Sequence, residues 1–532
     1  MKSLLVFALA CLAFAWSDGF SADNGRYDFI ISGGMVVDGT GNPWYRADIG
    51  IIGDKIAEIG KIPAEQGKRV IDATGKMVTP GFVDIHSHCE SGILDNQTVH
   101  NMVTQGVTTV IGGNCGGSPL ELGAFFSEVE LKGIGVNLGV LTGHNSIRRK
   151  VMGNEGREPT AAELESMKEI VAHEMQAGAL GLSTGLKYRP GVYAKTAEVV
   201  ELARVAASYG GFYASHLRDE GHGLLESVQE AIGIGEQAGI AVQMSHHKAV
   251  GKDMWGKTRE SLALMEQARG RGLDVTTDLH PYPATFTGMT IIFPAWAIEG
   301  SEKAIKQRLA DPPTREKVIE GIVWAIVHDR GGNDPANLQV GGYPTEPLLE
   351  GMNFHEILLQ RGVEPSIRNA AELALEFYEH GGASIIYHCL DKEDVVRTLS
   401  HPLAMIASDA GNAHLGQSKP HPRHYGCFPR VLAMHVRDQG DLRLEQAVRK
   451  MTSFPAFRVG AKDRGIINRN MAADIVVFDP DNVQDKATWT NPHQYAEGIE
   501  YVFVNGTLVV EQAKVTGNLP GRIVYGSRKI RH

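Results

Sequence analysis

The 532-residue sequence predicts an α/β protein with a (β/α)8 barrel in the middle of the chain. Short apolar segments alternate with longer helical patterns from residue 81 to residue 456. Short β-type segments split by turns occupy both ends, residues 23–80 and 457–532. One stretch, about 293–351, does not fit the alternation. We therefore expect a small β-sandwich domain built from both chain ends, and a helical insertion in the barrel.

The two ends share one pattern of β-rich runs and turns. Residues 28–38 predict a β-hairpin with Gly33-Gly34 at its turn, and two further β-type runs follow at 48–59 and 68–72. The C-terminal end has similar runs, separated by turns such as Asn505-Gly506. These C-terminal runs are 473–478, 498–504 and 507–510. Such matching ends favour one domain to which both contribute.

The middle of the chain contains eight strand-like segments. They are 82–85, 106–111, 135–141, 179–183, 211–215, 240–245, 274–278 and 404–408. Helical patterns lie between most of them, including 160–177, 196–209, 221–238 and 258–271. No Gly-x-Gly-x-x-Gly follows the first strand, so a doubly wound open sheet is the weaker interpretation.

Composition and charge narrow the range of partners. The formal net charge is -10, and the chain has no long basic run. We therefore expect neither nucleic acid nor an anionic membrane surface as a partner. No stretch after the first 22 residues is long and apolar enough to predict a membrane-spanning helix.

The first 22 residues predict a signal peptide. Lys2 supplies the positive start, and residues 4–16 form an apolar run too short to span a bilayer. Cleavage after Ala22 is favoured over cleavage after Ala15, and lipidation at Cys11 is a weaker alternative. We expect a mature protein that is exported, to the periplasm or to the medium.

Four cysteines remain in the mature chain: Cys89, Cys115, Cys389 and Cys427. An even number in an exported protein permits disulfides, and a Cys89–Cys115 pair stays an alternative. A chain of this length does not need such cross-links, however. Cys115 follows a predicted barrel strand, so it is also a candidate metal ligand.

Polar side chains cluster where the predicted strands end, which in a barrel is one mouth. Metal-ligand residue types follow five of the eight strands: His86 and His88, Cys115, His216, His246, and Asp409. Zinc binds imidazole nitrogen, thiolate and carboxylate oxygen, and a catalytic site leaves one position open for water. Zinc also brings the pKa of that water from ~16 towards ~7. Asp409 can orient the resulting hydroxide, accept its proton and pass it to a leaving nitrogen.

Other interpretations of the same residues remain open. Cys115 can be an inert buried residue, His216 a satisfied core histidine, and Asp409 a turn cap. His246 and His247 are adjacent and face opposite sides of a strand, so we choose His246 as the ligand. His144 and His280 also follow strands, and we expect them to line the mouth.

Seven motifs resemble those of the amidohydrolase superfamily, and most closely its D-aminoacylase (N-acyl-D-amino-acid deacylase) branch. They are Gly-Phe-Val-Asp-Ile-His-Ser-His (81–88), Gly-Asn-Cys-Gly (113–116), Gly-Leu-Ser-Thr-Gly-Leu-Lys-Tyr (181–188), Ser-His-Leu-Arg-Asp-Glu (215–220), Ser-His-His-Lys (245–248), Ser-Asp (408–409) and His-Pro-Arg-His-Tyr-Gly-Cys-Phe-Pro-Arg (421–430). They run in order over nearly the whole mature chain.

The resemblance implies a role for each matching residue. The tightly bound zinc would be held by Cys115, His216 and His246, and a second, weaker metal position by His86, His88 and the shared Cys115. Asp409 would be the general acid/base, and Tyr188 would donate a hydrogen bond to the carbonyl oxygen. Arg423, helped by Lys248, would bind the substrate's α-carboxylate. Thr285 and His280 depart from the branch pattern near the substrate, which puts the side-chain preference in doubt.

The resemblance implies a zinc-dependent hydrolase that cleaves the amide bond of N-acyl-D-amino acids, giving a carboxylate and a D-amino acid. One alternative is a cyclic amidase of the dihydropyrimidinase or hydantoinase type, which usually needs a bridging lysine; Lys187 is near the expected place. A dipeptidase acting on a D-residue is another. A periplasmic metal- or amino-acid-binding protein is the non-enzyme alternative. The preference for D over L rests on the resemblance alone.

Overall fold

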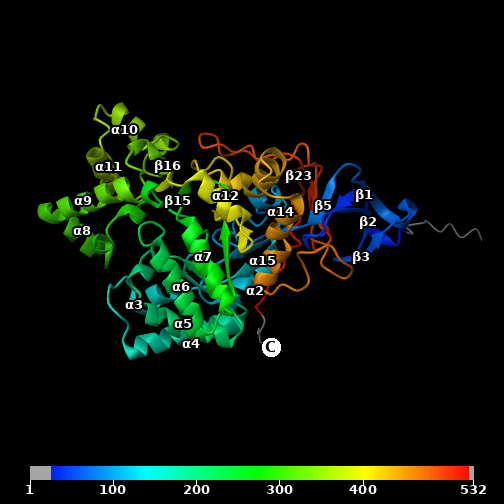
Figure 1. The fold of residues 1–532 in the computed structure, drawn as a ribbon, viewed down its shortest axis with the longest axis horizontal. Helices are drawn as coiled ribbons and strands as arrows, with labels where there is room; N and C mark the ends of the chain where they lie inside the picture. Colours follow the sequence, from blue (N-terminus) through cyan, green and yellow to red (C-terminus); the bar gives the residue numbers. More distant parts are fainter. Residues whose placement is uncertain (1–24, 527–532) are drawn as a thin grey trace, which may run out of the picture.

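The computed structural model describes residues 25–526 and confirms the barrel (Figure 1). The predicted signal peptide lies outside these residues. Eight parallel strands match the eight expected segments in order: β6 (Phe82–Asp84), β8 (Val107–Gly112), β9 (Asn137–Val140), β11 (Gly181–Gly185), β12 (Phe212–His216), β13 (Val242–Met244), β14 (Val275–Leu279) and β18 (Ala404–Ile406). No helix within residues 25–526 is both long enough and apolar enough to cross a membrane.

The last strand of the barrel meets the first through two short extensions. β19 (Ala410–Gly411) follows β18 and pairs in parallel with β7 (Ser87–His88), which follows β6. Between the two extensions, the Asp409 backbone N–H donates to the His86 carbonyl at 2.8 Å. The closure thus occurs at the carboxyl ends of the strands and brings Asp409 beside the two histidines.

The seam between β9 and β11 is filled by the C-terminal segment, residues 520–526. β10 (Thr142–Gly143) pairs with Leu182 and Ser183 of β11. Lower down, the Leu138 N–H donates to Arg522 at 3.0 Å, and the Val524 N–H donates back to Leu138 at 2.8 Å. The assignment of all of 457–532 to the β domain was therefore wrong at its end. The edge of β9 needs hydrogen-bond partners, and this segment supplies them.

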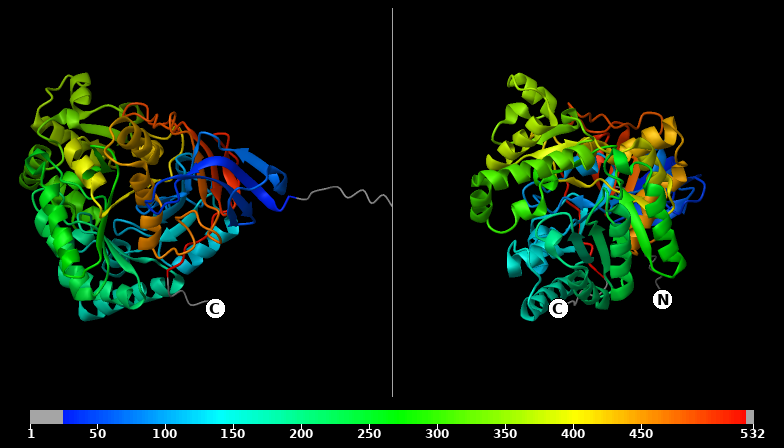
Figure 2. Two further views of the ribbon diagram at one scale, coloured as in Figure 1. Left: turned by 45° about the vertical axis from the view of Figure 1, so that its right-hand side comes forward. Right: turned by 60° about the vertical axis from the view of Figure 1, so that its left-hand side comes forward.

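Helices surround the barrel strands (Figure 2). They are α1 (His100–Val103), α2 (Leu122–Lys132), α3 (His144–Met152), α4 (Ala161–Ala177), α5 (Thr196–Ser208), α6 (Leu224–Ala238), α7 (Thr258–Gly270), α12 (Lys392–Ser400), α13 (Arg423–Arg430), α14 (Leu444–Met451) and α15 (Ser453–Arg458). Helices α4 to α7 confirm the four quoted helical patterns. α4 begins at a capping box in which Thr160 and Glu163 satisfy each other's backbone N–H groups, so its start was readable from the sequence.

Strands from both chain ends form one nine-stranded sheet, ordered β23-β22-β21-β20-β5-β1-β2-β3 with β4 also beside β1. Their bounds are β1 (Tyr27–Val36), β2 (Tyr45–Ile52), β3 (Lys55–Gly60), β4 (Gly67–Asp72), β5 (Met77–Pro80), β20 (Ile475–Phe478), β21 (Ile499–Val504), β22 (Thr507–Glu511) and β23 (Lys514–Val515). The two ends join where Pro80 of β5 pairs with Ile475 of β20. Apolar side chains from both ends share one core, including Ile31, Ile49, Val477 and Phe503.

The predicted hairpin over residues 28–38 is wrong. β1 is one continuous strand, and its pairing register with β2 shifts between Ile31 and Gly34. Gly33 has a φ of +72° there, which a glycine adopts without strain. Ser32 and Gly33 together lie opposite Asp48, so the chain forms a β-bulge here instead of a turn.

The inserted subdomain lies at the end of the molecule opposite β1 to β3 (Figure 1). It extends beyond the predicted range 293–351 and contains strands as well as helices. Its elements are β15 (Thr285–Gly288), α8 (Glu302–Ala310), α9 (Pro312–His328), β16 (Leu338–Gly342), α10 (Phe354–Gln360), α11 (Ile367–Glu379) and β17 (Ser384–Tyr387). β15 and β17 pair antiparallel, so the chain leaves and re-enters the barrel along adjacent strands.

The C-terminal seam generates a stability prediction. A Cβ atom added at Gly521 would lie 1.9 Å from the Val136 carbonyl oxygen, a backbone atom that cannot rotate away. We expect Gly521→Ala to lower the free energy of unfolding by roughly 1–3 kcal/mol and to lower the thermal unfolding midpoint. Gly270→Ala is the matched control, because nothing lies within 4 Å of its added Cβ. Equal midpoints for the two variants would show that the seam does not contribute to stability.

Candidate metal centre and active site

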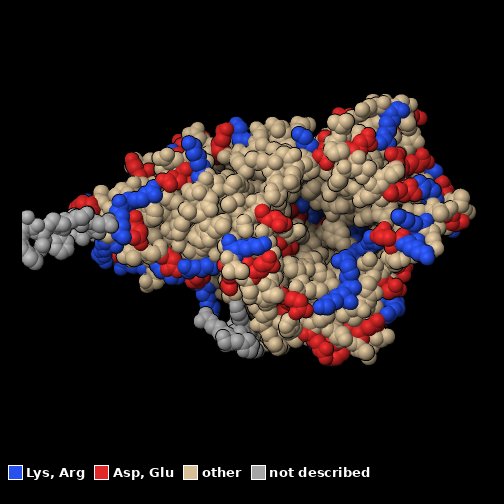
Figure 3. All heavy atoms as spheres, turned by 180° about the vertical axis from the view of Figure 1, so that it is seen from behind, with Lys and Arg blue, Asp and Glu red and all other residues tan. Residues whose placement is uncertain are grey.

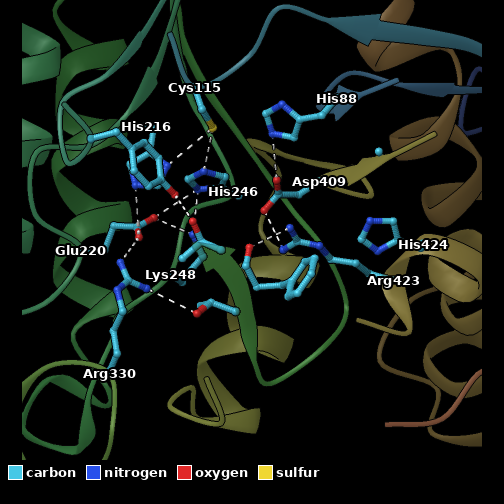
Figure 4. Close-up of a pocket in the computed structure, with 15 residues that line it drawn as sticks. His88, Cys115, His216, Glu220, His246, Lys248, Arg330, Asp409, Arg423 and His424 are labelled. Carbon is cyan, nitrogen blue, oxygen red and sulfur yellow. Dashed lines mark hydrogen bonds and ion pairs between the residues drawn. The ribbon is translucent and has the colours of Figure 1, made fainter. Parts of the chain in front are cut away.

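The carboxyl ends of five barrel strands bring the predicted metal ligands together. His86 and His88 follow β6, Cys115 follows β8, and His216 ends β12. His246 follows β13, and Asp409 follows β18. Figure 4 shows most of these side chains around one cavity of about 310 Å³. The strand-end prediction is thus supported for each of these residues by their positions in space.

The Cys115 thiol lies at the centre of three imidazoles. Its Sγ is 3.4 Å from His86 Nε2, 3.4 Å from His246 Nε2 and 3.6 Å from His216 Nδ1. A thiolate sulfur and an imidazole nitrogen bound to the same tetrahedral zinc lie about 3.6 Å apart. The donor types and their spacing therefore fit a zinc ion.

The protonation states of this cluster also fit a metal. Burial alone raises the pKa of the Cys115 thiol, but the His86 and His246 imidazoles outweigh burial and hold that pKa well below its usual value. The thiolate is the form that binds zinc. Cys89, Cys389 and Cys427 are buried free thiols, so the alternative of a Cys89–Cys115 disulfide is wrong.

Carboxylates lie behind the imidazoles that face Cys115. Asp278 Oδ1 lies 3.3 Å from His86 Nδ1, and Glu220 Oε1 lies 3.1 Å from His246 Nδ1. Glu220 Oε2 lies 3.6 Å from His216 Nε2. A carboxylate on the far nitrogen fixes the ring orientation and the tautomer of a ligating histidine.

A second group of donors lies beside the first. Asp409 Oδ1 is 3.3 Å from His88 Nε2 and 3.6 Å from His86 Nε2. Burial raises the pKa of Asp409, but Arg423 and His246 hold it well below its usual range. His86 belongs to both groups, so the two candidate metal positions are adjacent.

Three of the functional residues have strained backbones. Cys115, Asp409 and His246 have φ values of 53°, 52° and 34°, which residues other than glycine rarely adopt. Each such residue costs on the order of 1 kcal/mol or more and persists where the surrounding structure enforces it. Three of the eleven non-glycine residues with a positive φ among residues 25–526 belong to this cluster, and strain at such positions supports a functional role.

Tyr188 and Arg423 reach the same cavity from two directions. The Tyr188 hydroxyl lies 3.1 Å from Thr287 Oγ1, and burial raises its pKa, so it stays protonated and can donate a hydrogen bond. Arg423 Nη1 lies 2.7 Å from Asp409 Oδ2. Its buried Nε has no hydrogen-bond partner among residues 25–526. Arg423 itself lines the cavity, so its guanidinium is placed to meet a bound anion beside Asp409.

Lys248 and Thr285 line the cavity as expected, but each interacts with a residue that the sequence analysis did not assign. Lys248 Nζ donates to Glu220 Oε1 at 2.5 Å, and the Arg330 guanidinium lies 3.4 Å from Thr285 Oγ1. Arg330 also pairs with Glu220 at 3.0 Å. Glu220 was visible as the end of the motif 215–220, whereas Arg330 belongs to the insertion and has no local signal.

Two histidines expected at the mouth do not line it. His280 is buried against His421 and Tyr282, at ring-centroid distances of 5.5 and 6.3 Å. His144 instead pairs with Glu198 at 2.8 Å. His247 bonds Ser261 Oγ at 2.7 Å, which agrees with the choice of His246 as the ligand. Position after a strand predicts proximity to the mouth, but not the direction of the side chain.

Comparisons with known proteins agree with this geometry. The amidohydrolase family model matches residues 69–308 and 352–510. The N-acyl-D-glutamate deacylase of Alcaligenes xylosoxydans xylosoxydans is 35% identical over 523 residues, covering 94% of this chain and 96% of that one. The D-aminoacylase of the same organism is 34% identical over 526 residues, covering 94% and 98%.

Solved structures give the same result. A crystal structure of D-aminoacylase superposes with a TM-score of 0.79 and 34% identity, covering 93% of this chain and 99% of that one. The N-acyl-D-glutamate deacylase from Bordetella bronchiseptica, complexed with zinc and a phosphonate inhibitor, has a TM-score of 0.81 and 33% identity, covering 94% and 100%. By sequence and by structure, the chain belongs to the amidohydrolase family, in the same group as the D-aminoacylases.

Proposed function

We propose that this protein is a zinc-dependent hydrolase of N-acyl-D-amino acids that releases a carboxylate and a free D-amino acid. The observation that carries the proposal is the thiol-centred histidine cluster beside the Asp409–Arg423 ion pair. One part matches a metal centre, and the other offers an acid/base group next to an anion-binding group. The activities named for the similar proteins supply the substrate class.

The first metal position is assigned to Cys115, His216 and His246, and the second, weaker one to His86 and His88 with the shared thiolate. For D-aminoacylase, the reported behaviour is activation by one metal and attenuation by the second. When bound, zinc supplies Lewis-acid chemistry and lowers the pKa of water to about 7. Asp409 Oδ1 faces the second position, so a second ion would compete with its role in proton transfer.

The side chains around the cavity then have distinct tasks. Asp409 accepts a proton from the attacking water and returns it to the departing nitrogen. The neutral Tyr188 hydroxyl donates to the carbonyl oxygen as negative charge develops there. Arg423 binds the α-carboxylate, and Thr285 lies in the cavity wall beside Arg330. Lys248 acts mainly by holding Glu220 in place behind His246.

The charges lining the cavity favour a substrate with one carboxylate. Lys248, Arg330 and Arg423 are cationic, and Glu220 and Asp409 are anionic. The Cys115 thiolate is a third anion, so these side chains carry no surplus charge. Each cation is already ion-paired, Lys248 and Arg330 with Glu220 and Arg423 with Asp409. A single α-carboxylate can share Arg423 with Asp409, whereas a second carboxylate would meet no unpaired cation among the lining residues.

The cyclic-amidase alternative lacks its bridging lysine. Lys187 Nζ lies 3.4 Å from Asp329 and 3.7 Å from Asp219, and it is not among the residues lining the cavity. The histidine cluster is already bridged by the Cys115 thiol. Similarity to hydantoinase structures is at 15–18% identity and concerns the fold alone.

We also propose that the protein is exported, on the basis of the signal-like pattern of residues 1–22. N-terminal sequencing of the mature protein checks this: a start near Ser21 to Asp23 is expected, and an intact N-terminus would contradict export.

The substrate assay tests the proposed function. We expect the zinc-loaded protein to release amine from N-acetyl-D-methionine and not from its L enantiomer. With N-acetyl-D-glutamate, kcat/KM should be at least about tenfold lower, because the second carboxylate has no surplus positive charge to meet. Hydrolysis of hydantoin or a dipeptide, with no activity on any N-acyl amino acid, would refute the substrate class. A preference for the glutamate substrate would refute only the charge argument.

Cys115→Ser tests the centre of the metal site. Serine keeps the size of the side chain but is a poor zinc ligand, so we expect zinc per chain to fall by at least about tenfold. The measurement is metal analysis after dialysis. Cys389→Ser is the matched control, since Cys389 is a buried thiol outside the cluster and its replacement should leave the zinc content unchanged. Equal zinc in both variants would exclude Cys115 as a ligand.

Asp409→Asn separates proton transfer from metal binding. The amide cannot carry the proton, so we expect kcat to fall by roughly 10²–10⁴-fold, while the zinc at Cys115, His216 and His246 is retained. Turnover is measured on the preferred D substrate and zinc on the same sample. Near-normal turnover with full zinc content would exclude Asp409 as the acid/base group.

A further inference from the structure

A second set of metal-ligand residue types lies outside the catalytic cavity. His222 is in the loop between β12 and α6, and Asp253 is in the 3-10 helix Lys252–Met254 that follows β13. His328 is the last residue of α9 in the inserted subdomain. All three side chains are about half exposed, at 44%, 54% and 44%. The set therefore combines two barrel loops with the insertion.

The spacing of the donor atoms suits a bound cation better than hydrogen bonds. Asp253 Oδ2 lies 3.5 Å from His222 Nε2 and 3.4 Å from His328 Nδ1. The three donor atoms all lie within 4.8 Å of one another. Hydrogen bonds between nitrogen and oxygen are usually about 2.7–3.2 Å long, so these contacts are long. Two donors on one tetrahedral zinc, with bonds of about 2.0–2.1 Å, lie roughly 3.3 Å apart.

We propose that His222, Asp253 and His328 bind zinc or a similar first-row divalent metal. Two imidazoles and one carboxylate are suitable ligands for such ions. A surface depression of about 410 Å³ borders Asp253 and His328 and leaves room for water at the remaining coordination positions. The bound ion would join the inserted subdomain to the barrel, and this site is separate from the thiol-centred cluster.

The site is coupled to the catalytic cavity through the chain itself. His222 lies two residues after Glu220, and His328 lies two residues before Arg330. Glu220 and Arg330 form a buried ion pair of 3.0 Å behind His246. An ion held by the two histidines would fix both backbone segments that carry this pair. The surface site thus has a structural route to the position of His246, whichever substrate the enzyme hydrolyses.

Trp324 is a built-in reporter for this site. It lies one turn before His328 on α9, with ring centroids 5.6 Å from His328 and 5.9 Å from His222. Its side chain is 53% exposed. Binding of an ion to the histidines would change the surroundings of the indole, and hence its fluorescence.

Zinc titration of the holoenzyme tests the proposal. The protein is first loaded with zinc at the catalytic centre, and further Zn²⁺ is added while calorimetry and tryptophan fluorescence are recorded. Beyond any ion taken up at the weaker catalytic position of His86 and His88, we expect one additional ion per chain, and its binding should give a saturable fluorescence change. His328→Ala should weaken this binding at least about tenfold, and Trp324→Phe should remove the fluorescence change but keep the heat of binding.

His173→Ala is the matched control. His173 is an exposed histidine, with its side chain 59% exposed, near the carboxylates of Glu121 and Glu174. It belongs to no three-donor group among residues 25–526, so its replacement should leave the additional site intact. If His328→Ala lowers the thermal midpoint, His222→Ala replaces it as the test variant. The proposal is overturned if the wild type binds no further ion, or if the His222 and His328 variants bind it as the wild type does.

Discussion

The Cys115 thiolate is the group on which the arrangement of the cavity depends. Three buried imidazoles point at its sulfur. Without a negative charge or a metal ion at that point, no attractive interaction would offset the cost of burying three polar rings together. Asp278 and Glu220 hold the far sides of the rings, and Lys248 and Arg330 in turn hold Glu220. Buried charge of one sign is thus matched by buried charge of the other through successive layers around the thiol.

The inserted subdomain is part of the catalytic cavity, not an appendage to the barrel. Its first strand, β15, provides Thr285, Phe286 and Thr287 to the cavity wall. Thr287 orients the Tyr188 hydroxyl, and Arg330 binds Glu220. Seen from the back, the surface is hollowed between the subdomain and the barrel, and charges of both signs are interspersed around it (Figure 3). Movement of the subdomain would therefore alter substrate contacts directly.

The sequence was informative where local periodicity determines direction. The ends of successive strands predicted His86, Cys115 and Asp409. The choice of His246 over His247 agrees with their contacts, Cys115 and Ser261, although both histidines lie beyond β13, where strand alternation no longer applies. The sequence was less informative about contacts between residues that are far apart along the chain. Arg330 reaches Glu220 across 110 residues, and no local pattern marks such a contact. The Gly33-Gly34 pair illustrates the same limit, since two glycines suit a turn and a bulge equally, and only pairing with β2 decides.

The C-terminal seam has a consequence for the order of folding. Residues 520–526 complete the wall between β9 and β11, and β20 completes a sheet whose first strands begin near residue 27. Neither the barrel nor the β domain can therefore reach its final form while the chain is still being synthesised. A chain cut short before β20 would therefore lack part of both domains.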